Sequence, residues 1–140
     1  MDRDTLLALA ERCETATLPL PDRILNRDIA RAIGWGYRPP SEMGRKNPGW
    51  FHPEDCRHGV PVLDSLHGTD VWREPLDYVG SVDAALTLVG DDHWRVEDHP
   101  LAGPCAVVGD AEGYAPSPTL ALMSAALRNL AARTQEPTPC

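Results

Sequence analysis

The C-terminal stretch Gly113–Arg133, with the sequence GYAPSPTLALMSAALRNLAAR, constrains the fold more than any other part of the chain. Ser117 is a favourable N-cap, because its hydroxyl can accept a hydrogen bond from a free amide of the first helical turn. Pro118 suits the first helical position, where a missing N–H costs nothing. Apolar side chains then recur at helical spacing at Leu120, Met123, Leu127, Leu130 and Ala131. The stretch therefore predicts a long helix with one apolar stripe.

Two helices are predicted near the N-terminus. Asp2 or Asp4 can cap the first one, and the second begins at Asp22 and ends at Gly34. The spacing of apolar residues predicts an inward face for each helix. For the first helix this face is Leu6, Leu9, Ala10 and Cys13. For the second helix it is Leu25, Ile29, Ala32 and Ile33.

Between these helices and the C-terminal one, the sequence predicts a short helix and two strands. Ser81 caps the helix at residues 83–89, which buries Leu86 and Val89. Residues 93–97 alternate apolar and polar side chains, so they predict a half-buried strand with Trp94 and Val96 inward. Residues 98–104 are expected to form a turn segment. A second, more apolar strand is expected at residues 105–108.

The middle of the chain, about residues 35–77, is punctuated by prolines and glycines and keeps no periodicity. It nevertheless contains three of the four tryptophans, which a solvated linker would not need. We expect an ordered, loop-rich insertion packed on the domain through its aromatic side chains, with short strands at residues 35–38 and 60–63. Residues 1–134 are then one domain, and residues 135–140 a flexible tail.

Composition excludes several classes of function. The net charge is −8, with 21 acidic residues against 13 Lys and Arg, so the surface repels polyanions and nucleic-acid binding is not expected. No run approaches the roughly 20 apolar residues that span a bilayer, and the N-terminus has no cleavage-site pattern. The four widely spaced cysteines favour reduced thiols in the cytosol, with Cys13 and Cys105 in the core.

No set of residues in the sequence has a spacing that predicts a catalytic site. His52, Asp55, Cys56 and His58 could in principle hold zinc or pair a thiol with an imidazole, but their spacing matches no common ligand pattern. The alternative interpretation is a polar surface loop. A cluster of four acidic residues is more typical of a solvated acidic rim than of a general acid or a magnesium site. It consists of Asp91, Asp92, Glu97 and Asp98. We therefore expect no enzyme, no resident metal and no cofactor.

A binding site is the function that the remaining residues favour, because aromatic faces stack on planar rings and arginine pairs with phosphate. Its candidate residues are Trp35, Tyr37, Arg38, Arg45, Lys46 and Trp50, with Ser117 and Thr119 at the start of the C-terminal helix. The alternative is that the aromatic side chains form the core of the insertion. For the helix start, an ordinary cap is the simpler interpretation.

The order of these segments resembles the phage α–β–α sandwich domain family, small proteins of tailed phages and prophages. The resemblance is carried by LLALAERCETAT, by the helix ending at Trp35, and most specifically by the blocks SVDAALTLV and PSPTLALMSAALR. Tyr78-Val-Gly precedes the first block where the family commonly has Tyr-Thr or Tyr-Ala, and the middle segment is longer and richer in proline. The resemblance implies an α+β fold, with a small antiparallel β-sheet between helices, and a phage product in the host cytoplasm. It transfers no catalytic residue.

Three functions follow as hypotheses. The first is an anti-defence protein that sequesters a nucleotide-derived immune signal, such as a cyclic dinucleotide or an ADP-ribose derivative, without chemistry. The second is a phage protein that binds and inhibits a host defence protein through its acidic surface. The third is a small metal-dependent hydrolase. A homo-oligomer, a dimer or higher, suits all three, because a thin domain leaves one face poorly covered.

Overall fold

The computed structural model describes residues 2–16, 23–38, 49–53, 56–57, 60–61 and 74–134. The helices among these residues are α1 (Arg3–Glu14), α2 (Arg23–Ala32), α3 (Val82–Val89) and α4 (Pro118–Arg133). The strands in the first half are β1 (Gly36–Arg38), β2 (Gly49–Phe51), β3 (Cys56–Arg57) and β4 (Val60–Pro61). The strands in the second half are β5 (Trp94–His99), β6 (Gly103–Val108) and β7 (Ala111–Tyr114). This is an α+β fold with small antiparallel sheets, as predicted.

Local capping sets the start of three helices, as their sequences predict. Asp2, Ser81 and Ser117 are the N-caps of α1, α3 and α4. Each side chain accepts a hydrogen bond from the backbone N–H three residues further on. At the other end of α2, Gly34 has a φ of 112°, which favours glycine and ends the helix at the predicted residue.

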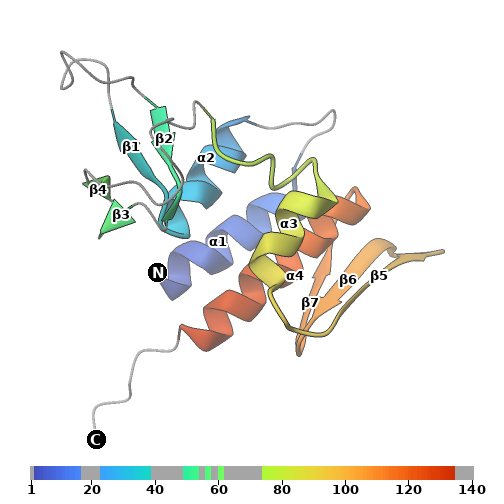
Figure 1. Cartoon of the computed structure of the whole chain (residues 1–140). Coiled ribbons are helices and arrows are strands. Elements are labelled where there is room, and N and C mark those ends of the chain that lie inside the picture. Colours follow the sequence, from blue (N-terminus) through green and yellow to red (C-terminus); the bar gives the residue numbers. More distant parts are fainter. Residues whose placement is uncertain are drawn as a thin grey trace, which may run out of the picture.

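Helix α4 is the centre of the packing. It contacts α1, α3 and all three strands of the larger sheet (Figure 1). The predicted stripe of Leu120, Met123 and Leu127 is fully buried, and so are residues between these positions, including Leu122 and Ala126. The single apolar stripe is therefore too narrow a prediction, because partners approach α4 from more than one side.

The larger sheet has the strand order β5-β6-β7, with every pair antiparallel. Ala106 and Val108 of β6 are buried towards α4, whereas Cys105 and Val107 alternate onto the other face. Strand β7 comes so close to α4 that a Cβ on Gly113 would lie 2.7 Å from the carbonyl oxygen of Ala121. The predicted turn at residues 98–104 is wrong in extent, because β5 and β6 continue into it.

Helix α4 covers only one face of this sheet. Helix α1 buries its predicted apolar residues Leu6, Leu9, Ala10 and Cys13, and its main partner is α4 rather than the sheet. The other face, which we call the open face, has mostly exposed or half-buried side chains. These are Arg95, Glu97, His99, Cys105, Val107, Glu112 and Tyr114. The described helices therefore do not enclose the sheet from both sides, unlike the sandwich that the resemblance implies.

A polar network joins α2 to residues 74–80. The side-chain amide of Asn26 donates to Asp77 Oδ1 at 2.8 Å, and the backbone N–H of Val79 donates to Asn26 Oδ1 at 3.0 Å. Asn26 is therefore buried with its polar atoms satisfied. Helix α2 buries Asn26 and Ala30 beside the predicted Leu25 and Ile29, whereas the predicted Ala32 and Ile33 are only half-buried.

The described part of the predicted insertion packs through its aromatic residues. Trp35, Trp50 and Phe51 are all buried. Strand β1 lies within the predicted strand at residues 35–38, and β4 begins the one predicted at residues 60–63. Strands β2 and β3 were not predicted, because no periodicity marks them. Trp72 and the predicted C-terminal tail lie outside the described residues.

Candidate interaction surface

The two tryptophans of the predicted binding site belong to the core. Trp35 is 3% exposed and Trp50 is 2% exposed. The indole N–H of Trp35 donates to Tyr78 Oη at 2.9 Å, and its ring meets that of His52 edge-on, with 5.3 Å between the centroids. We call Trp35, Trp50 and Tyr78 the aromatic cluster. Since the indoles are covered by the protein itself, their faces are not available to stack on a nucleotide base.

Trp50 is covered by two neighbours of the chain. The guanidinium carbon of Arg31 lies 5.4 Å from the Trp50 ring centroid, and the Tyr37 ring lies 5.2 Å from it on the paired strand. Tyr37 itself is exposed. Arg38 pairs with Gly49 through its strand backbone, whereas Arg45 and Lys46 lie outside the described residues.

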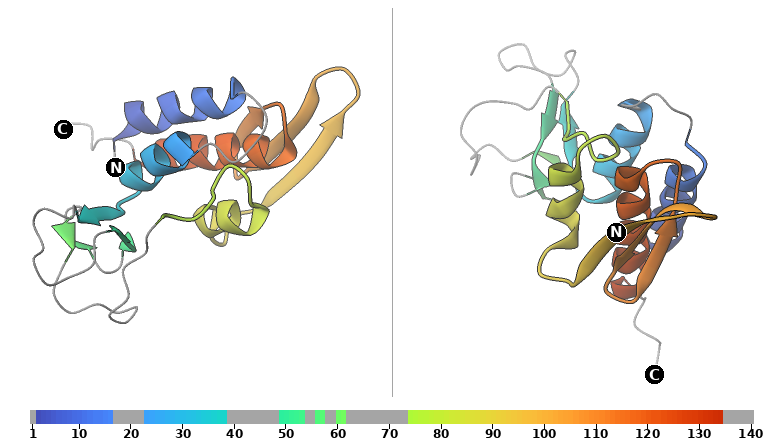
Figure 2. Two further views of the ribbon diagram at one scale, coloured as in Figure 1. Left: turned by 90° about the horizontal axis from the view of Figure 1, so that it is seen from above. Right: turned by 90° about the vertical axis from the view of Figure 1, so that its right-hand side faces the viewer.

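The start of α4 is an ordinary capped helix terminus. Ser117 Oγ accepts the N–H of Leu120 at 3.1 Å, so this hydroxyl already serves as the cap. Thr119 follows in the first turn and is half-buried. Figures 1 and 2 place this terminus at the opposite end of the molecule from β1 and β2. The structure thus does not bring Ser117 and Thr119 together with Tyr37 and Trp50.

The predicted metal motif is only partly described. His52 packs on Trp35, and Cys56 Sγ donates to the carbonyl oxygen of Phe51 at 3.6 Å. Asp55 and His58 lie outside the described residues. Within the described ranges, no three His, Cys, Asp or Glu side chains are grouped closely enough to hold a metal ion.

The predicted acidic rim divides into structural and exposed carboxylates. Asp92 accepts a hydrogen bond from Asn129 at 2.8 Å and forms an ion pair with Arg133, so it anchors the turn after α3 to α4. Glu97 pairs with Arg95 on the same strand. Asp91 and Asp98 are exposed, as expected for a solvated rim.

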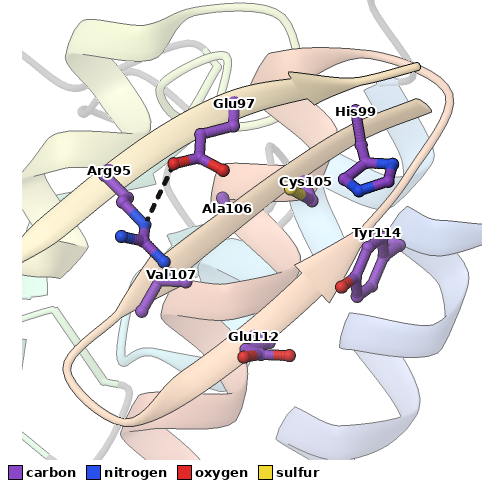
Figure 3. Close-up of a pocket in the computed structure, with 8 residues that line it drawn as sticks. All are labelled: Arg95, Glu97, His99, Cys105, Ala106, Val107, Glu112 and Tyr114. Carbon is purple, nitrogen blue, oxygen red and sulfur yellow. Dashed lines mark ion pairs between the residues drawn. The ribbon is translucent and has the colours of Figure 1, made fainter. Parts of the chain in front are cut away.

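The open face of the three-stranded sheet carries a shallow cavity of about 100 Å³ (Figure 3). The register explains which side chains meet there. Val107 lies between Arg95 and Glu112 on the neighbouring strands, and Cys105 lies between Glu97 and Tyr114. His99 and Ala106 complete the lining. Cys105 is half-buried on this face, so the prediction that it belongs to the core is wrong.

Two side chains of the open face have polar groups without a partner among the described residues. Arg95 Nε and Glu97 Oε1 lie 3.4 Å apart and form an exposed ion pair along one strand. The carboxylate of Glu112 and the hydroxyl of Tyr114 have no polar partner within the part of the chain that the structure describes. Tyr114 is also 46% exposed, with its ring beside the cavity. An exposed aromatic ring beside an unpaired carboxylate can hold a cationic group.

The sequence predicted only part of this surface. The alternation at residues 93–97 predicted that Arg95 and Glu97 lie opposite Val96, which the register confirms. Glu112 and Tyr114 were missed, because β7 has four residues and no apolar period. A recognisable signal was available in the glycine and aspartate at residues 109–110, a pair typical of a tight hairpin turn.

No protein-family model, curated protein or solved structure matches this chain. The resemblance to the phage α–β–α sandwich domain family therefore stays a prediction. Among the described helices, none combines the length and the apolar character that crossing a bilayer requires.

Proposed function

We propose that this protein is a non-enzymatic binding module whose open face docks a partner protein. The observation that supports this function is that the exposed Tyr114 ring and the unpartnered Glu112 carboxylate share the open face, two residues apart on β7. A lysine or arginine of the partner would lie against the ring and approach the carboxylate. Cation–π attraction and the ion pair would then act on the same side chain.

The size of the cavity favours a protein over a small molecule. Sites for small ligands typically enclose about 300–1,000 Å³ and cover most of the ligand. The cavity on the open face has about 100 Å³, which accommodates one side-chain head group but not a nucleotide. A broad face with one shallow depression is typical of a surface that receives a side chain from another protein.

The overall charge supports a basic partner. With a net charge of −8, the protein attracts a positively charged surface over longer distances than any single contact. Association by this route weakens as salt is added, because exposed charges are screened within about 10 Å at 0.1 M ionic strength. From the resemblance we further propose that the protein is phage-encoded, acts in the host cytoplasm and inhibits a host defence protein.

The test compares two exposed tyrosines. Tagged wild-type protein, Tyr114→Ala and Tyr37→Ala are used to capture proteins from host lysate at low and high salt. We expect a salt-sensitive partner that is retained by Tyr37→Ala and lost by Tyr114→Ala. Loss of that partner from Tyr37→Ala alone would place the site near β1 and contradict the proposal.

A direct measurement does not need the natural partner. We would titrate ¹⁵N-labelled protein with a short lysine-rich peptide and follow the backbone amide resonances. Shifts centred on Glu112 and Tyr114, abolished by Glu112→Gln, are the expected result. Shifts spread evenly over the acidic surface would contradict a defined site.

The nucleotide-sequestering hypothesis retains one accessible aromatic ring, Tyr37, next to the covered Trp50. It remains a proposal, supported by the composition of residues 35–50 rather than by a described cavity. Cyclic dinucleotides and ADP-ribose-type messengers should raise the melting temperature of the protein if it holds. A flat response across that set of compounds would remove this hypothesis and leave the docking proposal unaffected.

A further inference from the structure

The outer edge of β5 has unpaired backbone groups. The N–H of Gly109 donates to the carbonyl oxygen of His93 at 2.7 Å, so residues 93 and 109 form a hydrogen-bonded pair. In an antiparallel pair of strands, hydrogen-bonded residue pairs alternate with pairs that do not bond to each other. Arg95 and Glu97 therefore bond to β6, whereas the N–H and C=O groups of Trp94, Val96 and Asp98 point away from the sheet.

The opposite edge of the same sheet lies against α1 at Tyr114. The outward N–H of Tyr114 in β7 donates to Glu14 Oε2 at 3.4 Å, and Glu14 is held in place by an ion pair with Arg128. Helix α1 thus covers the end of the β7 edge at Tyr114. Strand β5 is different, because five of its six residues are exposed and it forms the outermost strand of a hairpin that extends past the helices (Figures 1 and 2).

We propose that β5 pairs antiparallel with β5 of a second copy of this chain, around a twofold axis at Val96. Val96 then lies opposite Val96 of the second copy, and Trp94 lies opposite its Asp98. All the outward backbone groups named above find partners in this register. The two three-stranded sheets become one six-stranded sheet, with both open faces on the same side, because directly opposed residues share a face.

The charges of β5 select this partner and this register. The twofold axis at Val96 brings Arg95 of each copy opposite Glu97 of the other, so two oppositely charged cross-strand pairs form. Shifting the strand by two residues would oppose Arg95 to Arg95 or Glu97 to Glu97. A shift of one residue would misalign the outward backbone groups. The edge is therefore complementary to itself in one register.

Exposed apolar surface beside the axis supports the same arrangement. Trp94 is 42% exposed, and Val96 is half-buried on the face of the sheet that packs on α4. In the paired arrangement, each Trp94 lies diagonal to Val96 of the other copy, within reach of an aromatic side chain. The dimer thus covers an exposed indole. This inference uses the edge of the sheet and holds whether or not the open face docks a protein.

The test is a charge exchange followed by sedimentation velocity over a range of concentrations. We expect wild type to show a concentration-dependent monomer–dimer equilibrium. Arg95→Glu or Glu97→Arg alone should weaken it about tenfold or more, because each turns both oppositely charged cross-strand pairs into like-charged pairs. The double variant Arg95→Glu/Glu97→Arg should restore it. Glu11→Arg, which makes the same change of charge as Glu97→Arg but on the exposed side of α1, should leave it unchanged.

A wild-type protein that stays monomeric at all concentrations would overturn the proposal. Single variants that dimerise as well as wild type, or a double variant that fails to recover, would also overturn it. Circular dichroism confirms that each variant is folded before its mass is interpreted.

Hydrogen exchange on the wild-type protein gives a second test that needs no substitution. The Val96 amide should become more protected as the protein concentration rises, because only the second copy can bond it. The Arg95 amide bonds to β6 and should be protected at every concentration. Equal behaviour of the two amides across the series would overturn the proposal.

Discussion

The aromatic cluster and the open face differ in what their side chains contact. Trp35, Trp50 and Tyr78 are buried, and their polar atoms or ring faces already have partners within the chain. Glu112 and Tyr114 of the open face are exposed and retain unused recognition groups. The first region has the composition expected of a binding site, whereas the second has the accessibility that binding requires.

This difference shows why residue type alone does not establish whether a side chain is accessible to a ligand. Tryptophan next to arginine predicts ligand stacking as readily as it predicts a core in which arginine covers an indole. The position of Arg31 over Trp50 realises the second possibility. Exposure of an unpaired polar group depends on the neighbouring elements, and no residue-type pattern encodes it.

Of the substitutions that compare the aromatic cluster with the open face, Trp35→Ala should change the free energy of unfolding most. We expect Trp35→Ala to lower the free energy of unfolding by about 3–5 kcal/mol, because it opens a large cavity and removes the donor to Tyr78. Tyr114→Ala on the open face should cost less than about 1 kcal/mol. Urea unfolding of both variants measures the difference. Similar costs for the two substitutions would contradict the assignment of Trp35 to the core.

The ionisation of Tyr78 tests whether the aromatic cluster is buried. Burial raises the pKa of Tyr78 to about 12, partly offset by the hydrogen bond from Trp35. In the unfolded chain a tyrosine ionises near pH 10, so between these two values the folded state keeps a proton that the unfolded state releases. The stability contributed by the neutral Tyr78 is therefore complete below pH 10 and decreases as the pH rises through about 12.

This decrease should amount to about 2 kcal/mol and can be isolated with a matched variant. Tyr78→Phe cannot ionise, although it is less stable at neutral pH because the Trp35 indole loses its acceptor. Denaturant titrations of both proteins at increasing pH should show the gap in stability narrowing above pH 10. A gap that stays constant to pH 12 would show that Tyr78 is not desolvated.

Adjacent valines on β6 test where burial ends. Val108 is fully buried towards α4, whereas Val107 lies on the open face. Val108→Thr should cost about 1–3 kcal/mol, because it buries a hydroxyl without a partner. Val107→Thr should stay within about 0.5 kcal/mol of wild type. Thermal unfolding of the two variants provides the measurement, and equal costs would mean that the two faces are equally covered.

The smallest expected effect is a gain at Ser124. Its Oγ is buried and has no hydrogen-bond partner in the described part of the chain. Ser124→Ala should therefore raise the free energy of unfolding by up to about 1 kcal/mol. Ser117→Ala, the same chemical change at the cap of the same helix, should lower it by about 1 kcal/mol. Changes of the same sign in the two variants would contradict the assigned roles.

The helices were predictable because their signals are local. A cap such as Ser117 acts on an amide three residues away, and apolar spacing within a few turns identifies the face that becomes buried. These rules located α1, α3 and α4 almost to the residue. They failed at Asn26, whose burial depends on Asp77 and Val79, about fifty residues further along the chain.

Strand β7 and the open face could be recognised only from the tertiary structure. The residues Ala111–Tyr114 have no apolar alternation, and they form a strand because β6 and α4 hold them in place. Gly113 is suited to this position because α4 leaves no space for a side chain. Its neighbours Glu112 and Tyr114 then necessarily point to the other face.

The sequence by itself determined the capped helices, the acidic character of the surface and the alternation of β5, because each depends on residues close together in the chain. The tertiary structure decided which aromatic residues are buried and which edge of the sheet is open. Helix α1 packs on α4 and reaches β7 through Glu14, and this placement leaves β5 and one face of the sheet uncovered. Burial is a property of packed neighbours, so no local pattern could supply it.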